Sequence, residues 1–198
     1  MLAAGRGVRF GGEIPKPLLE LGGRPLLLHA VDAAVASGLA PVVVVVSDDR
    51  TGAVLGAEER GAVVIARNAA PERGISSSLH VALQALETDA TVDAVVVGLA
   101  DQPLVGSDAY RRVAGAHDEG AQLAVATYGG VRGNPVLIGR AHWDEALALE
   151  GDEGARVLLR RHGAVEVPCD GTGEPADVDT PADLIALETV WRSQTISE

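Results

Sequence analysis

The chain has 198 residues, 47% of them hydrophobic and 22% charged, so it is long enough and apolar enough to fold around its own core. The formal net charge at pH 7 is −12, which argues against a nucleic-acid partner, because phosphate backbones are bound through basic surfaces. Cys169 is the single cysteine, which excludes an internal disulfide and a metal site built from cysteines. With no recognisable signal peptide and no apolar run of membrane-spanning length, we expect a cytoplasmic protein without membrane association.

The first sixteen residues combine four glycines with three cationic side chains. Glycine lets backbone N–H groups approach a ligand closely, and successive N–H groups form an anion-binding nest. Arg6, Arg9 and Lys16 add positive charge for phosphate oxygens. Lys16 is the only lysine beside fifteen arginines, which indicates a need for a compact point charge at this position. A flexible glycine-rich segment is the alternative interpretation.

Only Met1, Leu2 and Ala3 precede this glycine loop, too few for a strand of ordinary length. In a doubly wound sheet, a phosphate-binding loop follows a central first strand. We therefore expect either that the natural protein has residues upstream of Met1 or that the first strand is a stub.

Apolar periodicity predicts alternating helices and strands through the first half of the chain. The expected elements are a helix over 24–37, a buried strand over 41–47, a helix over 51–60, a second buried strand over 62–66 and a helix that follows the polar loop 68–78. This alternation predicts a parallel sheet with helices on both faces. The loop carries Asn68, Gly74 and three serines, Ser76–Ser78, which are candidates for a helix cap or for ligand contacts.

A third strand over 92–99 leads directly into Asp101-Gln102-Pro103. A carboxylate just beyond the carboxyl end of a central strand is where α/β enzymes place ligand-binding groups. Aspartate is also a common turn residue, so its position alone leaves the role of Asp101 open.

The second half continues the alternation of strands and helices. We expect a helix over 107–119 with Ser107 as its N-cap, a strand over 122–127, a turn over 129–133, an extended segment over 134–140, a helix over 151–161, a strand over 164–168 and a closing helix over 181–191 capped by Thr180. Acidic residues at helix starts, such as Asp152, Glu153 and Asp183, are explained equally well by the helix dipole.

Several other site classes have no support in the sequence. The five histidines are scattered without metal-ligand spacing. No G-x-S-x-G motif exists, and Pro17 after Lys16 excludes the P-loop pattern. The glycine spacing is not G-x-G-x-x-G, which argues against a dinucleotide-binding oxidoreductase.

The pattern L-A-A-G-x-G-x-R…P-K over residues 2–16 resembles the signature loop of nucleotidyltransferases that build nucleoside-diphosphate conjugates from NTPs. Sugar-nucleotide pyrophosphorylases and the MobA-like NTP transferases of molybdenum-cofactor synthesis belong to that group. Further segments resemble the same family in chain order: N…G-x-x-S-S-L over 68–79, L-A-D-Q-P over 99–103, G-N-P-V over 133–136, G-D-E-G-A-R over 151–156 and D-V-D-T-P-x-D over 177–183.

This resemblance implies a three-layer, Rossmann-like, doubly wound α/β fold with a mostly parallel sheet, as in nucleotide-diphospho-sugar transferases. It implies one nucleotidyltransferase domain over 1–198 whose first strand is shortened. The most similar group is that of molybdenum cofactor cytidylyltransferases, which implies Mg²⁺-dependent transfer of an NMP from an NTP, CTP favoured, with release of pyrophosphate. The implied acceptor is the phosphorylated molybdopterin cofactor, with a molybdoenzyme or its chaperone as a further partner.

Carried over residue by residue, the motifs assign catalytic roles to Lys16, Asp101 and Arg9. Asp101 and Asp179 are the implied metal ligands, with Asp177 as the fallback for the second. The implied nucleotide-binding residues are Leu2, Ala3, Ala4, Gly5, Arg6, Gly7, Lys16, Asn68, Gly74 and Ser78.

Two alternatives stay open beside this interpretation. The segment Gly11–Pro15 lengthens the spacing before Lys16, as in sugar-nucleotide pyrophosphorylases, which leaves the base and the acceptor undecided. A sugar-1-phosphate nucleotidyltransferase is therefore the first alternative, although the short chain and the G-N-P-V and G-D-E-G-A-R segments argue against it. A non-catalytic nucleotide-binding module is the second, and the presence of both Lys16 and Asp101 argues against it.

Overall fold

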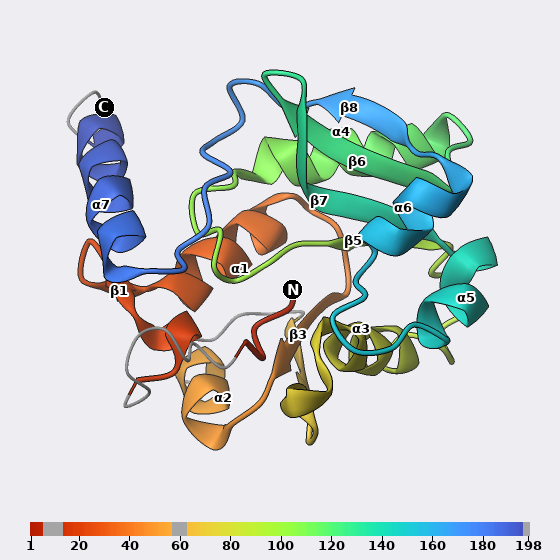
Figure 1. The fold of residues 1–198 in the computed structure, drawn as a ribbon, viewed down its shortest axis with the longest axis horizontal. Coiled ribbons are helices and arrows are strands. Elements are labelled where there is room, and N and C mark those ends of the chain that lie inside the picture. The colour runs from red at the N-terminus through yellow and green to blue at the C-terminus, as the bar shows by residue number, and fades with distance from the viewer. Residues whose placement is uncertain (6–13, 57–62, 196–198) are drawn as a thin grey trace.

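The computed structural model covers the whole chain, and it describes residues 1–5, 14–56 and 63–195 (Figure 1). Its first half contains η2 (Lys16–Leu18), β1 (Glu20–Leu21), β2 (Arg24–Pro25), α1 (Leu26–Ala36), β3 (Val42–Val46), α2 (Asp49–Gly56), β4 (Val63–Arg67), η3 (Pro71–Arg73), α3 (Ile75–Gln84) and β5 (Ala94–Val97). Its second half contains α4 (Ser107–Asp118), β6 (Leu123–Tyr128), β7 (Val131–Gly139), η4 (Arg140–His142), α5 (Trp143–Leu147), α6 (Arg156–His162), β8 (Val165–Pro168) and α7 (Pro181–Thr195).

The central sheet is mostly parallel, as the sequence predicts. β3 pairs with β4 in parallel, and a second group of strands has the order β5-β7-β6-β8. Leu2 forms parallel bridges to Val45 on one side and Leu99 on the other, and thereby joins the two groups. Within the described strands of this sheet, β7 is the antiparallel member, because it pairs antiparallel with β5 and β6 while β6 and β8 run parallel.

Residues 1–3 lie at the centre of this sheet. The Leu2 N–H donates to the Gly98 carbonyl at 2.9 Å, and the Ala3 N–H donates to the Val45 carbonyl at 2.8 Å. The Met1 nitrogen donates to the Val43 carbonyl at 2.7 Å. A cavity of about 360 Å³ lies beside Met1, between the β3 and β5 edges. The glycine loop therefore begins at the carboxyl edge of the two central strands.

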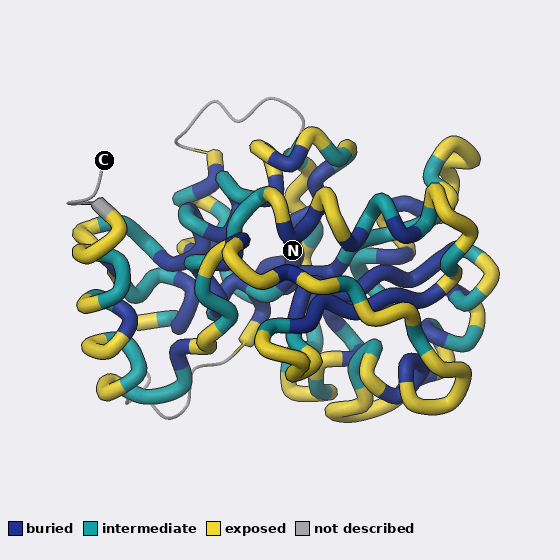
Figure 2. Tube along the Cα trace, turned by 90° about the horizontal axis from the view of Figure 1, so that it is seen from above, coloured by how far each residue is buried: buried dark blue, intermediate teal, exposed yellow. Residues whose placement is uncertain are grey.

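Helices cover both faces of the sheet, which confirms the expected three-layer arrangement. Alternate residues of β3 enter two separate cores: Val44 packs with α1 and α4, whereas Val43 and Val45 pack with α3, α5 and α6. Seen from above, the buried strands run through the middle of the molecule, with more exposed segments above and below them (Figure 2).

α7 lies at one side of the molecule in Figure 1, apart from the helices on the sheet faces. It packs on the β1–β2 hairpin through a small core of Leu21, Leu26, Val178 and Leu187. Gly22 has a φ of +60°, and a Cβ there would lie 2.4 Å from the Trp191 ring, so glycine is needed for this contact. This packing holds the segment before α7 close to η2.

Two local expectations are wrong, and one of two open interpretations is excluded. β4 is an edge strand rather than a buried one, and its Val64 and Ile65 are each 45% exposed. The N-cap of α3 is Gly74, so Ser76–Ser78 lie within the helix instead of capping it. α4 is preceded by Gly106, and Ser107 instead accepts a hydrogen bond from Arg111 at 3.1 Å.

Within the described part of the chain, no helix has the length and apolar composition needed to cross a bilayer.

Candidate active site

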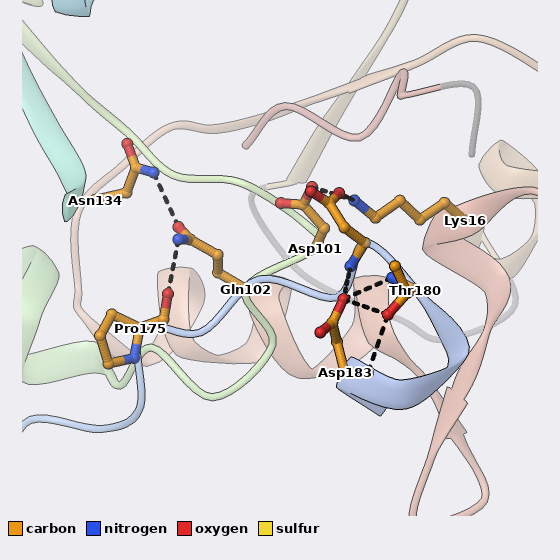
Figure 3. Close-up of polar contacts among 8 residues, drawn as sticks. Lys16, Asp101, Gln102, Asn134, Pro175, Thr180 and Asp183 are labelled. Carbon is orange, nitrogen blue, oxygen red and sulfur yellow. Dashed lines mark hydrogen bonds and ion pairs between the residues drawn. The ribbon is translucent and has the colours of Figure 1, made fainter. Parts of the chain in front are cut away.

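Three distant segments bring one lysine and two aspartates together at the carboxyl edge of the sheet. Lys16 Nζ donates to Asp101 Oδ2 at 2.7 Å and to Asp179 Oδ1 at 2.6 Å (Figure 3). The two carboxylates come from positions 85 and 163 residues further along the chain. The structure therefore brings the lysine and both aspartates that the sequence motifs single out into direct contact.

Each of these side chains is positioned by local backbone structure. Lys16 opens η2 between Pro15 and Pro17, whose fixed φ angles restrict this turn. Asp101 lies in the turn just after Leu99, where the chain leaves the sheet. The Val178 N–H donates to the Asp101 carbonyl at 2.9 Å, which ties the segment of Asp179 to that turn.

Asp179 is oriented by the start of α7. Its N–H donates to Asp183 Oδ2 at 3.0 Å, and the Thr180 N–H donates to the same oxygen at 2.6 Å. The Asp183 N–H donates in return to Thr180 Oγ1 at 3.3 Å, which confirms Thr180 as the cap of the helix. Hydrogen bonds from the Thr180 hydroxyl and N–H hold the pKa of Asp183 below its ordinary value. Asp177 is exposed, and of the two candidate ligands Asp179 is the one that contacts Lys16.

The lysine of this cluster is shielded from water, whereas its two partners are partly exposed: the side chains of Asp101 and Asp179 are 28% and 43% exposed. Lys16 is 8% exposed, and its burial alone would lower its pKa. The Asp101 and Asp179 carboxylates outweigh that effect, so the pKa of Lys16 is raised and the ammonium stays charged. One cation beside two carboxylates leaves the cluster with a net negative charge.

Asp101 retains binding capacity for a cation. Its Oδ1 atom is buried and has no hydrogen-bond partner among the residues that the structure describes. A buried carboxylate oxygen without a partner is destabilising, and a divalent cation would satisfy it. Mg²⁺ is commonly held by one or two carboxylates plus the phosphates of a substrate, so Asp101 and Asp179 fit this ion.

A cavity of about 390 Å³ opens beside Lys16 and Asp101. Its volume is within the range of small-molecule sites. The described residues of its lining include the carboxylates of Glu72, Asp101 and Asp152 and the ammonium of Lys16. The remaining lining residues are Leu2, Ala3, Ala4, Gly5, Pro17, Pro71, Gly74, Ile75, Ser78, Leu99 and Ala100.

The start of the glycine loop lies on this cavity, because Leu2, Ala3, Ala4 and Gly5 all line it. Arg6, Gly7 and Arg9 lie outside the described residues.

Asn68 shapes the loop that leads to α3. Its side chain is 2% exposed, donates to Ser77 Oγ at 2.8 Å and Ser78 Oγ at 3.0 Å, and accepts the Ala70 N–H at 2.9 Å. Ser78 itself lines the cavity, so Asn68 positions part of the cavity wall through its hydrogen bond to Ser78.

Gly74 brings a second loop to the cavity. Its φ is +89°, and a Cβ at this position would lie 2.2 Å from the Gly151 carbonyl oxygen. The Ser76 N–H donates to that same oxygen at 3.2 Å. This backbone contact places the segment of Asp152 at the cavity, although residues 151–155 precede α6 instead of opening it as expected.

Sequence reasoning assigned no role to Gln102, which connects three parts of the site. Gln102 Nε2 donates to the Pro175 carbonyl at 2.8 Å, and Asn134 Nδ2 donates to Gln102 Oε1 at 3.0 Å (Figure 3). The amide pair thereby ties the Asp101 turn to β7 and to the segment that leads to Asp179. A polar residue directly after Asp101 and an asparagine within the apolar β7 segment were the available signals.

Comparison with curated proteins finds nucleotidyl-transferring relatives. The chain is 32% identical over 144 residues to the bifunctional protein GlmU of Sorangium cellulosum, which covers 71% of this chain and 30% of the relative. It is 38% identical over 134 residues to the 2-C-methyl-D-erythritol 4-phosphate cytidylyltransferase of Streptomyces coelicolor, which covers 62% of this chain and 46% of the relative. The chain spans between 25% and 30% of the length of the first three curated relatives.

Solved structures show the same fold. Rv0371c from Mycobacterium tuberculosis H37Rv superposes with a TM-score of 0.78 at 30% identity, covering 95% of each chain. The complex of Rv0371c with manganese gives a TM-score of 0.75 at 28% identity, again covering 95% of each chain. The sequence also matches the MobA-like NTP transferase domain over residues 1–167, which is most of its length. The chain therefore belongs to the MobA-like NTP transferase family.

Proposed function

We propose that the protein is a Mg²⁺-dependent nucleotidyltransferase. It transfers the NMP unit of an NTP, with CTP favoured, to a phosphorylated acceptor, the molybdopterin cofactor, and releases pyrophosphate. The observation that carries this proposal is the contact of Lys16 with both Asp101 and Asp179 at a cavity of nucleotide-accommodating size.

In the proposed reaction, a phosphate oxygen of the acceptor attacks the α-phosphorus, and the bond from that phosphorus to the pyrophosphate oxygen breaks. The protein provides no nucleophile, so its contribution is positioning and charge neutralisation. Asp101 and Asp179 would hold a divalent cation, which supplies Lewis-acid stabilisation of phosphate oxygens. Lys16 supplies a fixed positive charge for the α-phosphate. Backbone N–H groups of residues 4–7, with Arg9, are proposed to bind the β- and γ-phosphates.

The preference for CTP rests on the loop from Asn68 to Ser78, which resembles the cytidylyltransferase version of this segment. The similarity to the curated cytidylyltransferase relative from Streptomyces coelicolor supports the same base. Base choice depends on a few hydrogen bonds, and a pocket that bonds one base rejects others that leave its polar groups unpaired.

The choice of molybdopterin as acceptor rests on the G-N-P-V and G-D-E-G-A-R segments. Asp152 of the second segment lines the cavity, and Asn134 of the first is tied to Gln102 next to Asp101. Both segments therefore lie at or beside the proposed site. The long spacing between the glycine loop and Lys16 favours the second candidate acceptor, a sugar 1-phosphate.

A matrix of assays tests the proposal: each NTP is combined with Mg²⁺ and with either molybdopterin cofactor or a sugar 1-phosphate, and pyrophosphate release is measured. We expect the highest kcat/KM with CTP and molybdopterin. A GTP or ATP preference would reject the base, and faster turnover of the sugar phosphate would reject the acceptor. Tight NTP binding without pyrophosphate release in any combination would identify a non-catalytic nucleotide-binding module.

A further inference from the structure

A second cluster of ligand-type side chains lies where η4, α5 and α6 meet. His142, Glu145 and His162 each direct one nitrogen or oxygen into a group whose atoms all lie within 4.8 Å of one another. His162 Nε2 lies 2.6 Å from Glu145 Oε2, and the rings of His142 and His162 are 4.9 Å apart between centroids. The arrangement contradicts the expectation that the histidines lack a metal-ligand pattern.

This cluster and the active site lie at opposite ends of the strands of the sheet. It lies beside a groove lined by residues 121–123 and 163–165, at the amino ends of β6 and β8. Asp101, in contrast, follows the carboxyl end of β5. In Figure 1 the cluster's helices α5 and α6 lie on the side of the molecule opposite α7, whose start holds Asp179. A ligand of this cluster is therefore separate from a ligand of Lys16, Asp101 and Asp179.

The donor set selects a class of metal ion. Two imidazole nitrogens and one carboxylate oxygen suit Zn²⁺ and related transition metals, whereas Mg²⁺ and Ca²⁺ prefer oxygen ligands alone. A tetrahedral zinc ion with ligands about 2.0–2.1 Å away separates its ligand atoms by roughly 3.4 Å. The contact between His162 and Glu145 would open by about 0.8 Å, and the widest separation would close by up to about 1.4 Å. His142 and Glu145 are half-buried and His162 is exposed, so small side-chain rotations are possible.

The surroundings of Glu145 are those of a metal-binding carboxylate. Arg161 Nη1 donates to Glu145 Oε1 at 3.0 Å, so Oε2 is the oxygen directed at His162. A second-layer hydrogen bond of this kind orients a ligand and raises metal affinity.

The cluster also leaves a coordination position open. A groove of about 340 Å³ is lined by both His142 and His162, together with Gln122 and Gly163. A water molecule or an anion in that groove would complete a tetrahedral set of one carboxylate and two imidazoles.

We propose that His142, Glu145 and His162 form a binding site for a zinc-like divalent transition metal, independent of the proposed nucleotidyl transfer. The metal fastens the end of α6 to η4 and α5. These elements flank the connection 148–155, whose Asp152 lines the active-site cavity. The simpler interpretation is an exposed ion pair between Glu145, Arg161 and His162, and binding experiments separate the two.

The test uses the full chain carrying Asp101→Asn, because that change weakens metal binding at the other site. We expect calorimetric titration with Zn²⁺ to show one equivalent bound, and Co²⁺ to give the visible absorption of a tetrahedral complex. Adding His162→Ala or Glu145→Gln should lower the Zn²⁺ affinity at least about tenfold and abolish the Co²⁺ spectrum. His117→Ala, which removes a histidine outside the cluster, should leave both readouts unchanged.

Three outcomes decide the proposal. It stands if Zn²⁺ affinity falls with His162→Ala and Glu145→Gln and persists with His117→Ala. It is overturned if the Asp101→Asn protein binds no Zn²⁺, which would leave only the ion pair, or if its Zn²⁺ affinity is unaffected by both cluster substitutions. Circular dichroism in EDTA checks that each variant is folded, which we expect because both substituted side chains are partly exposed.

Discussion

The two charged clusters of this protein are built in opposite ways. Lys16, Asp101 and Asp179 come from three segments far apart in the sequence, and the lysine at their centre is 8% exposed. Glu145 and His162 are 17 residues apart on neighbouring helices, and their side chains are 31% and 42% exposed. The carboxylates of the first cluster are exposed to a similar degree, 28% for Asp101 and 43% for Asp179, so the clusters differ in the burial of the lysine. Charges interact more strongly where water is excluded, so a defect at Lys16 is felt more than one in the second cluster.

The two clusters therefore depend on different parts of the fold. The lysine-centred cluster forms only when the central sheet, η2 and the start of α7 are all in place. The histidine cluster requires only that α6 packs beside η4 and α5. A fully buried ion pair costs about 3–5 kcal/mol to break, and an exposed pair contributes about 0–1 kcal/mol. Because Lys16 is buried and its carboxylates are partly exposed, we expect its pairs to lie between these limits. Four substitutions test this contrast, in order of decreasing expected effect.

Asp101→Asn should produce the largest change, a loss of metal-dependent turnover of about 100-fold or more, because it removes a charge that the proposed metal ion requires. Steady-state pyrophosphate release at several Mg²⁺ concentrations measures this effect. Asp93→Asn is the matched control, since Asp93 lies at the opposite end of the same strand region and is exposed. Normal turnover of Asp101→Asn at ordinary Mg²⁺ would show that Asp101 is a turn residue and that the site is misplaced.

Lys16→Arg keeps the positive charge but should reduce turnover by about tenfold or more, equivalent to about 1.4 kcal/mol of barrier. A planar guanidinium cannot occupy the compact position that the ammonium holds between the two carboxylates. Lys16 is 8% exposed, so we also expect a lower melting temperature. Rate and melting temperature are measured on the same preparation, and a wild-type rate would refute the catalytic role.

Asp183→Ala should destabilise the protein at neutral pH, because it removes the carboxylate that accepts the Asp179 and Thr180 N–H groups at the start of α7. The folded-state pKa of Asp183 is below the ordinary value of 3.8. Its contribution is therefore present above that value and is lost as the pH falls through the lower, folded-state pKa. Urea unfolding of both proteins between neutral and acidic pH measures the difference. A difference that does not shrink at acidic pH would contradict the assignment.

Glu145→Gln should have the smallest effect on the free energy of unfolding in the absence of metal, because the pair with Arg161 is exposed. Urea unfolding in EDTA provides the measurement. A loss comparable to that expected for a buried pair would mean that the two clusters are energetically alike, and the contrast between them would fail.

Much of the fold could be predicted because it depends on local patterns. The continuous valines of β3 indicate a strand buried on both faces, and the structure confirms it. The exposure of β4 could not be predicted in the same way, since an edge position is a property of strand order and leaves little mark on a five-residue segment. The start of α3 was misplaced because the positive φ of Gly74 marks the boundary before the serines.

In the candidate site, too, the local patterns could be predicted and the tertiary contacts could not. The sequence motifs identified Lys16, Asp101 and Asp179, but the contacts of Lys16 with the two aspartates depend on tertiary packing between segments far apart in the sequence. The histidine cluster was missed although His142 and Glu145 have helical i, i+3 spacing. Its third member, His162, lies on another helix, so no single segment shows the full ligand set.

The close approach of Gly74 to Gly151 affects how the cavity could be redesigned. At this point the wall consists of two backbones in contact, with no side chain whose replacement could reshape it. Any larger residue at position 74 would push the two loops apart before it altered selectivity. Engineering of substrate preference is therefore better directed at Glu72 and Asp152, which both line the cavity.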